Sequence, residues 1–316
     1  MKILVTPTSL QPGGNQKALE RLKEFSQDLI FNEKKRPLSP EELLPLLKDC
    51  DGYLAGLDSI TGDVLKECKN LKVISRYGTG YDRVDVSSAK KYGITVTNTP
   101  GVNAEAVGEL AMGLLLSAAR QIPYLDQTTR EGKWIRLTGV ELKDKTLGIM
   151  GLGAIGKVVA RSAEGFGMKV IAYDPYINQT YCQEHQIEPV SKEELFERAD
   201  AITLHLPLNE ETTHLIDDRA IEKMKGGVIL VNASRGGIVD EEAVYRGLKT
   251  GKIAGLGLDA FEHEPPENSP LFEFPNVVVT PHTGAHTQEA TNLMAERAID
   301  NLIKVLNGED CPYIVE

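Results

Sequence analysis

Short apolar, β-branched runs alternate with helical segments along almost the whole chain, and this alternation constrains the fold more than any other feature. Strands that alternate with helices in this way form βαβ units, in which neighbouring strands lie parallel in one sheet. The expected strands span residues 2–5, 28–31, 52–55, 72–75 and 94–97 in a first series, and 146–150, 169–174, 201–206, 227–232, 253–260 and 276–280 in a second. Five strands and six strands favour two open sheets over one sheet of eleven. We therefore predict an α/β fold with two doubly wound parallel-sheet domains.

Helical segments with clear end signals separate the strands. A long helix is expected at 104–120, between the two series, and a final helix at 288–306, before Asn307-Gly308. Ser191 and Glu194 have the spacing of a capping box, which marks a helix start between two strands of the second series. The local signals therefore agree with the alternation.

Composition excludes several classes of protein. The chain has 316 residues, of which 41% are hydrophobic and 26% charged, as in an ordinary globular protein and unlike a disordered chain. A formal net charge of −11 supplies no basic field for nucleic acid or for anionic lipid. The longest apolar stretch, Leu110 to Ala119, covers about half of a membrane span. We therefore expect neither nucleic acid nor membrane as a partner.

The cysteines and the amino terminus favour the cytoplasm. Four cysteines are widely spaced without a C-x-x-C pair, which is typical of free thiols in a reducing compartment: Cys50, Cys68, Cys182 and Cys311. The first residues, "MKILVTPTSL", have an apolar run too short for the core of a signal peptide, and they fit a first strand better.

A glycine-rich turn links the first strand of the second series to a helix. Gly151, Gly153 and Gly156 form G-x-G-x-x-G in "TLGIMGLGAIGKVVARSAEGFG". The first glycine permits the tight turn, the second lets the backbone approach a pyrophosphate, and the third lets the helix pack on the strand. The helix N-terminus then offers free N–H groups to an anion. The pattern alone is weak, but between a strand and a helix it predicts a dinucleotide site.

Asp174 ends the next expected strand. An acid at this place can accept both ribose hydroxyls of the adenosine, and it would repel a 2′-phosphate. Pro175 and Tyr176 follow, so the chain offers no arginine there to hold that phosphate. The position favours NAD over NADP, although an aspartate that merely caps a turn is the plain structural alternative.

Three ionisable residues follow the last three strands of the second series. Arg235 comes after 227–232, Glu264 after 253–260 and His282 after 276–280. In open α/β sheets ligands bind beyond the carboxyl ends of the strands, so the three side chains can converge without proximity in sequence.

Their chemistry suits the oxidation of an alcohol. An imidazole can exchange the proton that accompanies hydride transfer, a carboxylate can fix its tautomer and stabilise the imidazolium, and a guanidinium can grip a substrate carboxylate. Each residue also has a plain reading as a solvated or structural side chain. Glu262 and His263 are local competitors of Glu264 for the role of the acid.

The motifs "DKTLGIMGLGAIG", "LVNASRGGIVDEEAV", "GLDAFEHEPP" and "VVVTPHTGAHTQEA" resemble those of the D-isomer-specific 2-hydroxyacid dehydrogenases, and the resemblance covers nearly the whole chain. It implies that Arg235, Glu264 and His282 are the catalytic set, with Glu264 rather than Glu262 as the acid. The small residues after His282 would leave room for nicotinamide and substrate. The implied cofactor is NAD, without a metal, and the remaining expected NAD contacts are Ala154, Ile155, Leu206, Ala233, Ser234, Asp259 and Gly284.

The resemblance also implies the domain organisation. The family has a flavodoxin-like substrate domain built from both ends of the chain, here 1–97 and 286–316, and an inserted Rossmann NAD-binding domain, here 98–285. It further implies a homodimer held largely through the inserted domain.

The loop "SRYGTGYDRVD" resembles the substrate loop of 3-phosphoglycerate dehydrogenases, which act in serine biosynthesis. Arg76 matches an arginine that helps to hold the substrate phosphate there, and Tyr77, Gly78 and Thr79 complete an expected anion nest. One departure is Ala55-Gly56, where that group often carries a second phosphate-binding arginine. We also expect no serine-sensing domain, since the sequence ends at Glu316.

The first choice of substrate is therefore the pair 3-phosphoglycerate and 3-phosphohydroxypyruvate, with glyoxylate, hydroxypyruvate or another short 2-keto acid as the alternative. A reading of another class is an NAD(H)-sensing binding protein like the corepressors that share this fold. Formate dehydrogenase, which also resembles the family, lacks the glutamate, so Glu264 argues against it.

Overall fold

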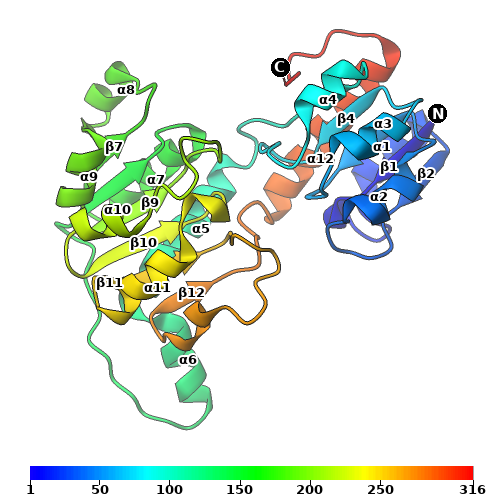
Figure 1. The fold of residues 1–316 in the computed structure, drawn as a ribbon. Helices are drawn as coiled ribbons and strands as arrows, with labels where there is room; N and C mark the ends of the chain where they lie inside the picture. Colours follow the sequence, from blue (N-terminus) through cyan, green and yellow to red (C-terminus); the bar gives the residue numbers. More distant parts are fainter. Residues whose placement is uncertain (316) are drawn as a thin grey trace. The chain divides into compact units, whose positions relative to one another are not determined.

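The computed structural model describes residues 1–315, which fall into two compact units (Figure 1). One unit comprises residues 1–103 and the chain from His286 onward, and the other comprises residues 104–285. The sequence placed the inserted domain at 98–285, and the compact unit of the structure runs from Ala104 to Ala285. Backbone bonds explain the difference: Asn98 N donates to Tyr313 O (3.2 Å) and Thr99 N to Gly78 O (3.1 Å), which holds this stretch against the first unit.

The first unit is built on a five-stranded parallel sheet in the order β2-β1-β3-β4-β5. Its strands are β1 (Lys2–Val5), β2 (Asp28–Phe31), β3 (Gly52–Ala55), β4 (Val73–Arg76) and β5 (Thr95–Thr97). Its helices are α1 (Gln16–Phe25), α2 (Pro40–Leu47), α3 (Gly62–Glu67), α4 (Val86–Lys91) and α12 (Gln288–Asn307), with a 3₁₀ turn η1 (Thr8–Leu10). This strand order is that of the flavodoxin-like doubly wound fold, which confirms the prediction.

The C-terminal helix α12 completes the core of the first unit. Its apolar face, which includes Ile299 and Leu302, packs with Ile3, Val5 and Leu54 of the sheet in one buried cluster. Ser75 Oγ on β4 also donates to Ala298 O of α12 (2.8 Å). The two ends of the chain therefore build one core.

The second unit carries a seven-stranded parallel sheet in the order β12-β11-β10-β9-β6-β7-β8. The strands are β6 (Thr146–Met150), β7 (Lys169–Tyr173), β8 (Glu188–Pro189), β9 (Ala201–Leu204), β10 (Val228–Asn232), β11 (Ile253–Leu258) and β12 (Val277–Val279). The sequence predicted six strands and missed β8, a two-residue edge strand that contains a proline. So short a strand has no side-chain alternation to reveal it.

Helices cover both faces of this sheet (Figure 1). They are α5 (Ala104–Arg120), α6 (Ile122–Arg130), α7 (Ala154–Gly165), α8 (Gln179–Glu184), α9 (Lys192–Arg198), α10 (Asp218–Lys223) and α11 (Glu241–Lys249), with 3₁₀ turns η2 (Gly236–Ile238) and η3 (Pro270–Glu273). The expected capping box forms at the start of α9, where Ser191 Oγ accepts from Glu194 N (3.2 Å) and Glu194 Oε2 accepts from Ser191 N (2.9 Å).

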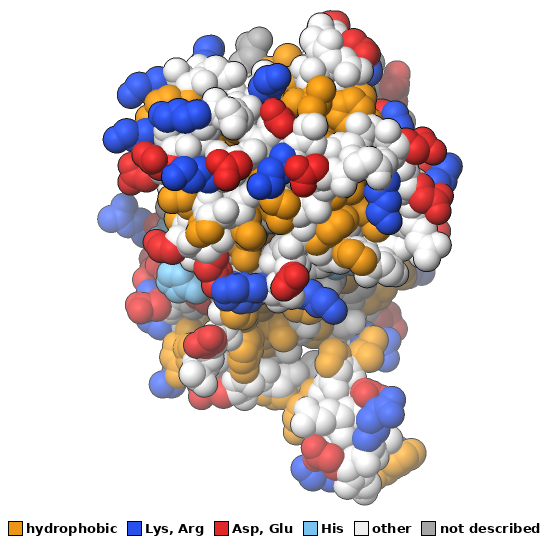
Figure 2. Space-filling view, turned by 90° about the vertical axis from the view of Figure 1, so that its right-hand side faces the viewer, with side chains coloured by type: hydrophobic (Ala, Val, Ile, Leu, Met, Phe, Trp, Pro, Cys, Tyr) orange, Lys and Arg blue, Asp and Glu red, His pale blue; other side chains and the backbone are white. Residues whose placement is uncertain are grey.

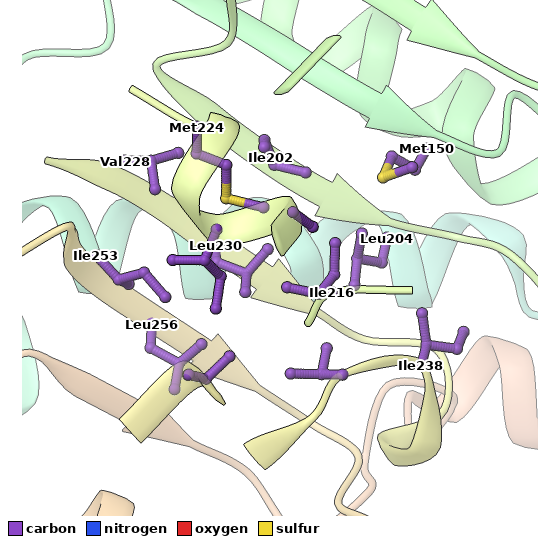
Figure 3. Packing of buried hydrophobic residues seen from close by; sticks show 14 of the residues in the cluster. Met150, Ile202, Leu204, Ile216, Met224, Val228, Leu230, Ile238, Ile253 and Leu256 are labelled. Atoms are coloured by element: carbon purple, nitrogen blue, oxygen red, sulfur yellow. The ribbon is translucent and has the colours of Figure 1, made fainter. Parts of the chain in front are cut away.

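The near-continuous apolar runs of the central strands are explained by burial on both sides. Figure 3 shows Ile202, Leu204 and Leu230 in the cluster that packs with residues of α10 and α11 on one face. Ile229 and Val231, which alternate with Leu230 along β10, belong to the cluster formed with α5 and α7 on the other face. Full burial of such side chains contributes roughly 1.5–3 kcal/mol each. Within residues 1–315 no helix has both the length and the apolar character to cross a bilayer.

Candidate active site

The glycine turn lies between β6 and α7. In the sheet, β6 has β7 as its neighbour on one side and β9 on the other, so the direction in which successive strands are added changes at β6. Gly151 has a φ of +96°, and a Cβ on Gly156 would lie 2.1 Å from Gly151 O. Both positions therefore require glycine, the first for its conformation and the third for the close approach of helix and strand. A Cβ on Gly153, the N-cap of α7, would meet no atom within 4 Å, so open space lies before the helix N-terminus.

The backbone of this turn suits a pyrophosphate. Ala154, Ile155 and Gly156 form the first turn of α7, and the N–H groups of a first helical turn have no partners within the helix. The positive end of the helix dipole lies at the same terminus, which favours an anion there.

Asp174 stands beside the turn, directly after β7. Its Oδ2 accepts from Leu152 N (2.8 Å) and its Oδ1 from Tyr176 N (2.8 Å). Each carboxylate oxygen can accept a further hydrogen bond, so the group remains able to bind a diol. The turn and the acid together fit an NAD molecule without a 2′-phosphate.

The other residues expected to contact NAD follow the carboxyl ends of four more strands. Leu206 follows β9, Ala233 and Ser234 follow β10, Asp259 follows β11 and Gly284 lies beyond β12. The hydroxyl of Ser234 is already used internally, since Oγ donates to Asn232 Oδ1 (2.7 Å). These residues therefore line the same edge of the sheet as the glycine turn.

His282 and Glu264 come together at this edge. The Nδ1 atom of His282 lies 2.8 Å from Oε1 of Glu264, which also accepts from Phe261 N (3.3 Å). Their side chains are 26% and 16% exposed, so the pair is largely shielded but still accessible. Glu262 points elsewhere and approaches His214 (3.3 Å). Of the two acids that the sequence offered, Glu264 is the one that contacts the imidazole.

Asp259 fastens the segment that carries His282. Its Oδ1 accepts from Thr280 Oγ1 (2.7 Å) and Thr283 N (2.7 Å), and its Oδ2 accepts from Gly284 N (2.8 Å). His282 itself has a φ of +52°, a left-handed conformation that costs a residue with a Cβ roughly 1–2 kcal/mol. The sequence offered Asp259 only as a cofactor contact, whereas the hydrogen bonds of its carboxylate in the structure hold Thr280, Thr283 and Gly284.

Arg235 begins the turn after β10. Its carbonyl accepts from Asn232 Nδ2 (2.8 Å) and its Nη1 donates to Ser234 O (2.8 Å). A Cβ on the next residue, Gly236, would lie 1.8 Å from the carbonyl carbon of Phe261. The turn of Arg235 and the turn before Glu264 thus pack backbone against backbone.

His205 was missed by sequence reasoning. Its Nε2 lies 2.9 Å from Thr203 Oγ1, and its Nδ1 is buried without a hydrogen-bond partner in the described chain. Burial lowers the pKa of His205 to about 3, so the ring is neutral in the folded protein. Its carbonyl oxygen is the atom that a Cβ on Gly151 would meet, at 2.7 Å. The only signal was a histidine at the end of "AITLHL", where apolar context masks it.

The expected substrate loop follows β4 in the first unit. Arg76 is only 3% exposed, and its guanidinium donates to Ala55 O (2.6 Å) and Gly80 O (3.1 Å). Tyr77 OH accepts from Ser9 Oγ (2.8 Å) and donates to Thr291 O (2.8 Å), and burial raises the pKa of its phenol to about 12. These two side chains therefore anchor the loop itself.

The tip of the loop is formed by the next two residues. Gly78 has a φ of +141°, and a Cβ there would meet no atom within 4 Å. Thr79 Oγ1 donates to Thr99 O (3.2 Å). Gly78 therefore leaves open space at the tip of the loop, and Thr79 beside it is exposed.

Comparison with known proteins defines the class. The family model for the NAD-binding domain of D-isomer specific 2-hydroxyacid dehydrogenases matches residues 112–284. The chain belongs to this family, and it is an NAD-dependent oxidoreductase that acts on the CH–OH group of a D-2-hydroxy acid.

Individual relatives carry different substrate names. A glyoxylate reductase of Korarchaeum cryptofilum is 41% identical over 309 residues, which are 95% of this chain and 92% of the relative. A D-3-phosphoglycerate dehydrogenase of Methanocaldococcus jannaschii is 44% identical over 282 residues, 88% of this chain but 54% of the relative. Among solved structures, the TT0316 protein of Thermus thermophilus superimposes with a TM-score of 0.90 and 37% identity, with both chains covered completely.

Proposed function

We propose that His282 is the proton donor and acceptor of this dehydrogenase, that Glu264 orients it, and that Arg235 binds the carboxylate of the substrate. The hydrogen bond between His282 Nδ1 and Glu264 Oε1 (2.8 Å) is the observation that carries the proposal. It supplies the arrangement that acid–base catalysis on a carbonyl or carbinol oxygen needs, at the edge of the sheet where ligands of this fold bind.

The two nitrogens of His282 have separate tasks. A carboxylate accepts hydrogen bonds only, so Glu264 keeps the proton on Nδ1 and leaves Nε2 for the substrate oxygen. In the direction of reduction the imidazolium gives its Nε2 proton to the keto oxygen, and in oxidation the neutral ring takes it back. When bound, NADH would supply the hydride to C2 in reduction, and NAD⁺ would accept it in oxidation. Glu264 stabilises the imidazolium form without transferring a proton itself.

Arg235 suits the part of the substrate that every 2-hydroxy acid shares. A guanidinium binds a carboxylate through two parallel hydrogen bonds, which fixes the acid and places its C2 atom. The backbone packing of Gly236 against Phe261 keeps this turn next to the one before Glu264.

NAD is held by the turn Gly151–Gly156 through its pyrophosphate and by Asp174 through the adenosine ribose. Residues 104–285 form the NAD-binding domain in this proposal. Residues 1–103 with the C-terminal segment form the substrate domain, in which the open space at Gly78 leaves room for an anion. Asp259 acts here by holding the segment of His282, through its bonds to Thr280, Thr283 and Gly284.

For the substrate, the pair 3-phosphoglycerate and 3-phosphohydroxypyruvate is supported by Arg76 in its loop and by the 44% identity to a D-3-phosphoglycerate dehydrogenase. The burial of Arg76, whose guanidinium donates to Ala55 O and Gly80 O, favours the second candidate, glyoxylate or hydroxypyruvate. A phosphate would have to compete with these two carbonyl oxygens for the guanidinium. The glyoxylate reductase relative, which is matched over 92% of its length, supports the same candidate.

A panel of 2-keto acids with NADH tests both levels of the proposal. We expect turnover of at least one short 2-keto acid, and loss of that turnover in Arg235→Ala for every acid accepted. A preference of at least tenfold in kcat/KM for 3-phosphohydroxypyruvate, lost in Arg76→Ala while hydroxypyruvate is spared, would establish the phosphorylated substrate. NADH binding without turnover of any acid would instead favour the NAD(H)-sensing binding protein.

The protein is a homodimer in this proposal, and the segment from Gln121 to Gly139 forms the contact. This segment leaves α5 and returns at Val140, whose N–H donates to Ala119 O (2.9 Å), and α6 extends from the sheet in Figure 1. In Figure 2 this segment projects from the rest of the molecule at the bottom of the view. The exposed apolar side chains on it include Ile122 (51%) and Trp134 (80%). Light scattering should give twice the mass of the chain, and Trp134→Ser should lower it towards that of a monomer.

A cytoplasmic location belongs to the same proposal. The four cysteines are all free and buried, with Cα positions spread over both units. Burial raises the pKa of the Cys50 and Cys68 thiols to about 11, which keeps them protonated and unreactive at neutral pH.

A further inference from the structure

Glu262 and Glu241 hold each other by a reciprocal pair of hydrogen bonds outside the proposed catalytic set. Glu262 N donates to Glu241 Oε1 (2.8 Å), and Glu241 N donates to Glu262 Oε1 (3.1 Å). Glu241 is the first residue of α11, and Glu262 lies two residues before Glu264. Each carboxylate therefore accepts a hydrogen bond from the backbone N–H of the other residue. The pair links the turn that carries Glu264 to the start of α11.

The two carboxylates lie unusually close together for groups of like charge. Burial raises the pKa of Glu241, and the neighbouring charge of Glu262 raises it further. The hydrogen bond from Glu262 N and the charge of His263 act in the opposite direction and lower the pKa of Glu241. On the other carboxylate, His214 Nε2 lies 3.3 Å from Glu262 Oε1. Two carboxylates repel each other, so this contact costs free energy. We relate it to the segments of the proposed active site that pack on Glu262.

Several segments of the proposed active site meet at Glu262. A Cβ on Gly236, next to Arg235, would lie 2.3 Å from Glu262 N, so the turn of Arg235 packs directly on this residue. The loop of His214 is joined to the same turn, since His214 N donates to Gly237 O (2.8 Å). On the other side, Glu264 Oε1 accepts from Phe261 N (3.3 Å) and contacts His282.

We propose that Glu262, clamped to Glu241 and contacted by His214, is a positioning residue that fixes the turn between Phe261 and Glu264 and thereby keeps the Glu264 carboxylate against His282. Glu262 touches none of the reacting groups, and it acts through Glu264. The inference rests on the proposed function, because it assumes that the Glu264–His282 pair performs the proton transfer.

The test compares Glu262→Ala with Glu262→Gln in the full-length enzyme. The alanine removes the acceptor for Glu241 N, and a lost hydrogen bond of this kind corresponds to a loss of about tenfold in kcat if it is expressed in the transition state. The glutamine keeps a carboxamide oxygen at the same place, so its kcat should stay within about threefold of the parent. Binding of NADH, followed by fluorescence titration, should be the same in both variants. Glu242→Ala, at a neighbouring side chain that is 90% exposed, is the matched control.

A double-mutant cycle shows whether Glu262 acts through Glu264. With Glu264→Ala as the background, Glu262→Ala should lower kcat by less than about twofold, because the group that it positions is already gone. A further tenfold loss in that background, or an unchanged kcat in Glu262→Ala alone, overturns the inference. If Glu262→Ala does not fold, Glu241→Ala tests the same clamp from its other side, with the same expected non-additivity. An unaltered kcat in Glu264→Ala itself would reject the proposed function instead, which keeps the two failures distinct.

Discussion

The two ends of the seven-stranded sheet's functional edge are built in different ways. Beyond β6 and β7 the site is made of backbone, with Gly151 and Gly156 in close contact and Asp174 bonded to Leu152 N. Beyond β11 and β12 it is made of side chains that reach across long intervals of sequence, such as Glu264 to His282 and Asp259 to Thr283. A backbone site tolerates few residue types at a few fixed positions, whereas a side-chain site depends on a network.

The largest effect is expected on the side-chain half. His282→Ala should lower kcat by about 10²–10⁴-fold, the usual contribution of general acid–base catalysis, while NADH still binds. Steady-state kinetics and a fluorescence titration with NADH measure the two quantities separately. If His282→Ala weakened NADH binding by a factor as large as its loss of kcat, His282 would serve cofactor binding as well as catalysis.

The next largest effect should lie on the backbone half. Gly156→Ala places a Cβ 2.1 Å from Gly151 O, so the turn must open and its N–H groups leave the pyrophosphate. Losing one or two hydrogen bonds to a charged group should weaken NADH binding roughly ten- to a hundredfold. Gly165→Ala is the control, since a Cβ there meets no atom within 4 Å. Equal NADH affinity in the two variants would contradict the fit of the turn to the cofactor.

A smaller effect is expected at Asp174, whose carboxylate lies beside the glycine turn and is the side chain on which this half of the edge depends. Asp174→Ala should raise kcat/KM for NADPH relative to NADH by about tenfold, because the variant no longer opposes a 2′-phosphate with a carboxylate. The measurement is the ratio of the two kcat/KM values in parent and variant. An unchanged ratio would mean that another group selects the cofactor.

A last effect concerns stability rather than kinetics, and it lies at His205, which borders the glycine turn. The pKa of about 3 in the folded protein lies below the value of 6.5 for an unperturbed histidine, so the unfolded chain binds the proton first. The stability that depends on the neutral ring is therefore present above pH 6.5 and is lost as the pH falls towards 3. Between pH 6.5 and 5 this loss is at most about 2 kcal/mol.

Urea unfolding at pH 7.5 and pH 5 measures that loss. His205→Gln, which can keep the bond to Thr203, should be less sensitive to acid than the parent protein. His185→Gln, at an exposed histidine, should match the parent. A parent and a His205 variant with the same loss of stability would show that the burial of this ring does not govern the acid side of the stability curve.

The same contrast explains what the sequence could predict. The glycine turn and Asp174 were found because their residue types and spacing follow from local backbone geometry. The convergence of His282 with an acid was predicted because parallel strands bring their carboxyl ends to one edge, whereas the choice of Glu264 over Glu262 came from the family resemblance. The task of Asp259 and the clamp of Glu241 with Glu262 were missed, since the bonds of a carboxylate to distant N–H groups leave no pattern in sequence. The positive φ of His282 was also invisible, because nothing in "TPHTG" marks which residue turns left-handed.

The construction of the first unit from both ends of the chain has a consequence for the order of events during synthesis. The sheet face formed by Ile3, Val5 and Leu54 emerges from the ribosome early, yet α12, which covers this face together with α1, is among the last segments to be made. Residues 104–285 are complete before α12 appears and can fold first. The nascent N-terminal sheet therefore waits with part of its apolar face uncovered, and transiently exposed apolar surface of this kind favours aggregation or capture by a chaperone.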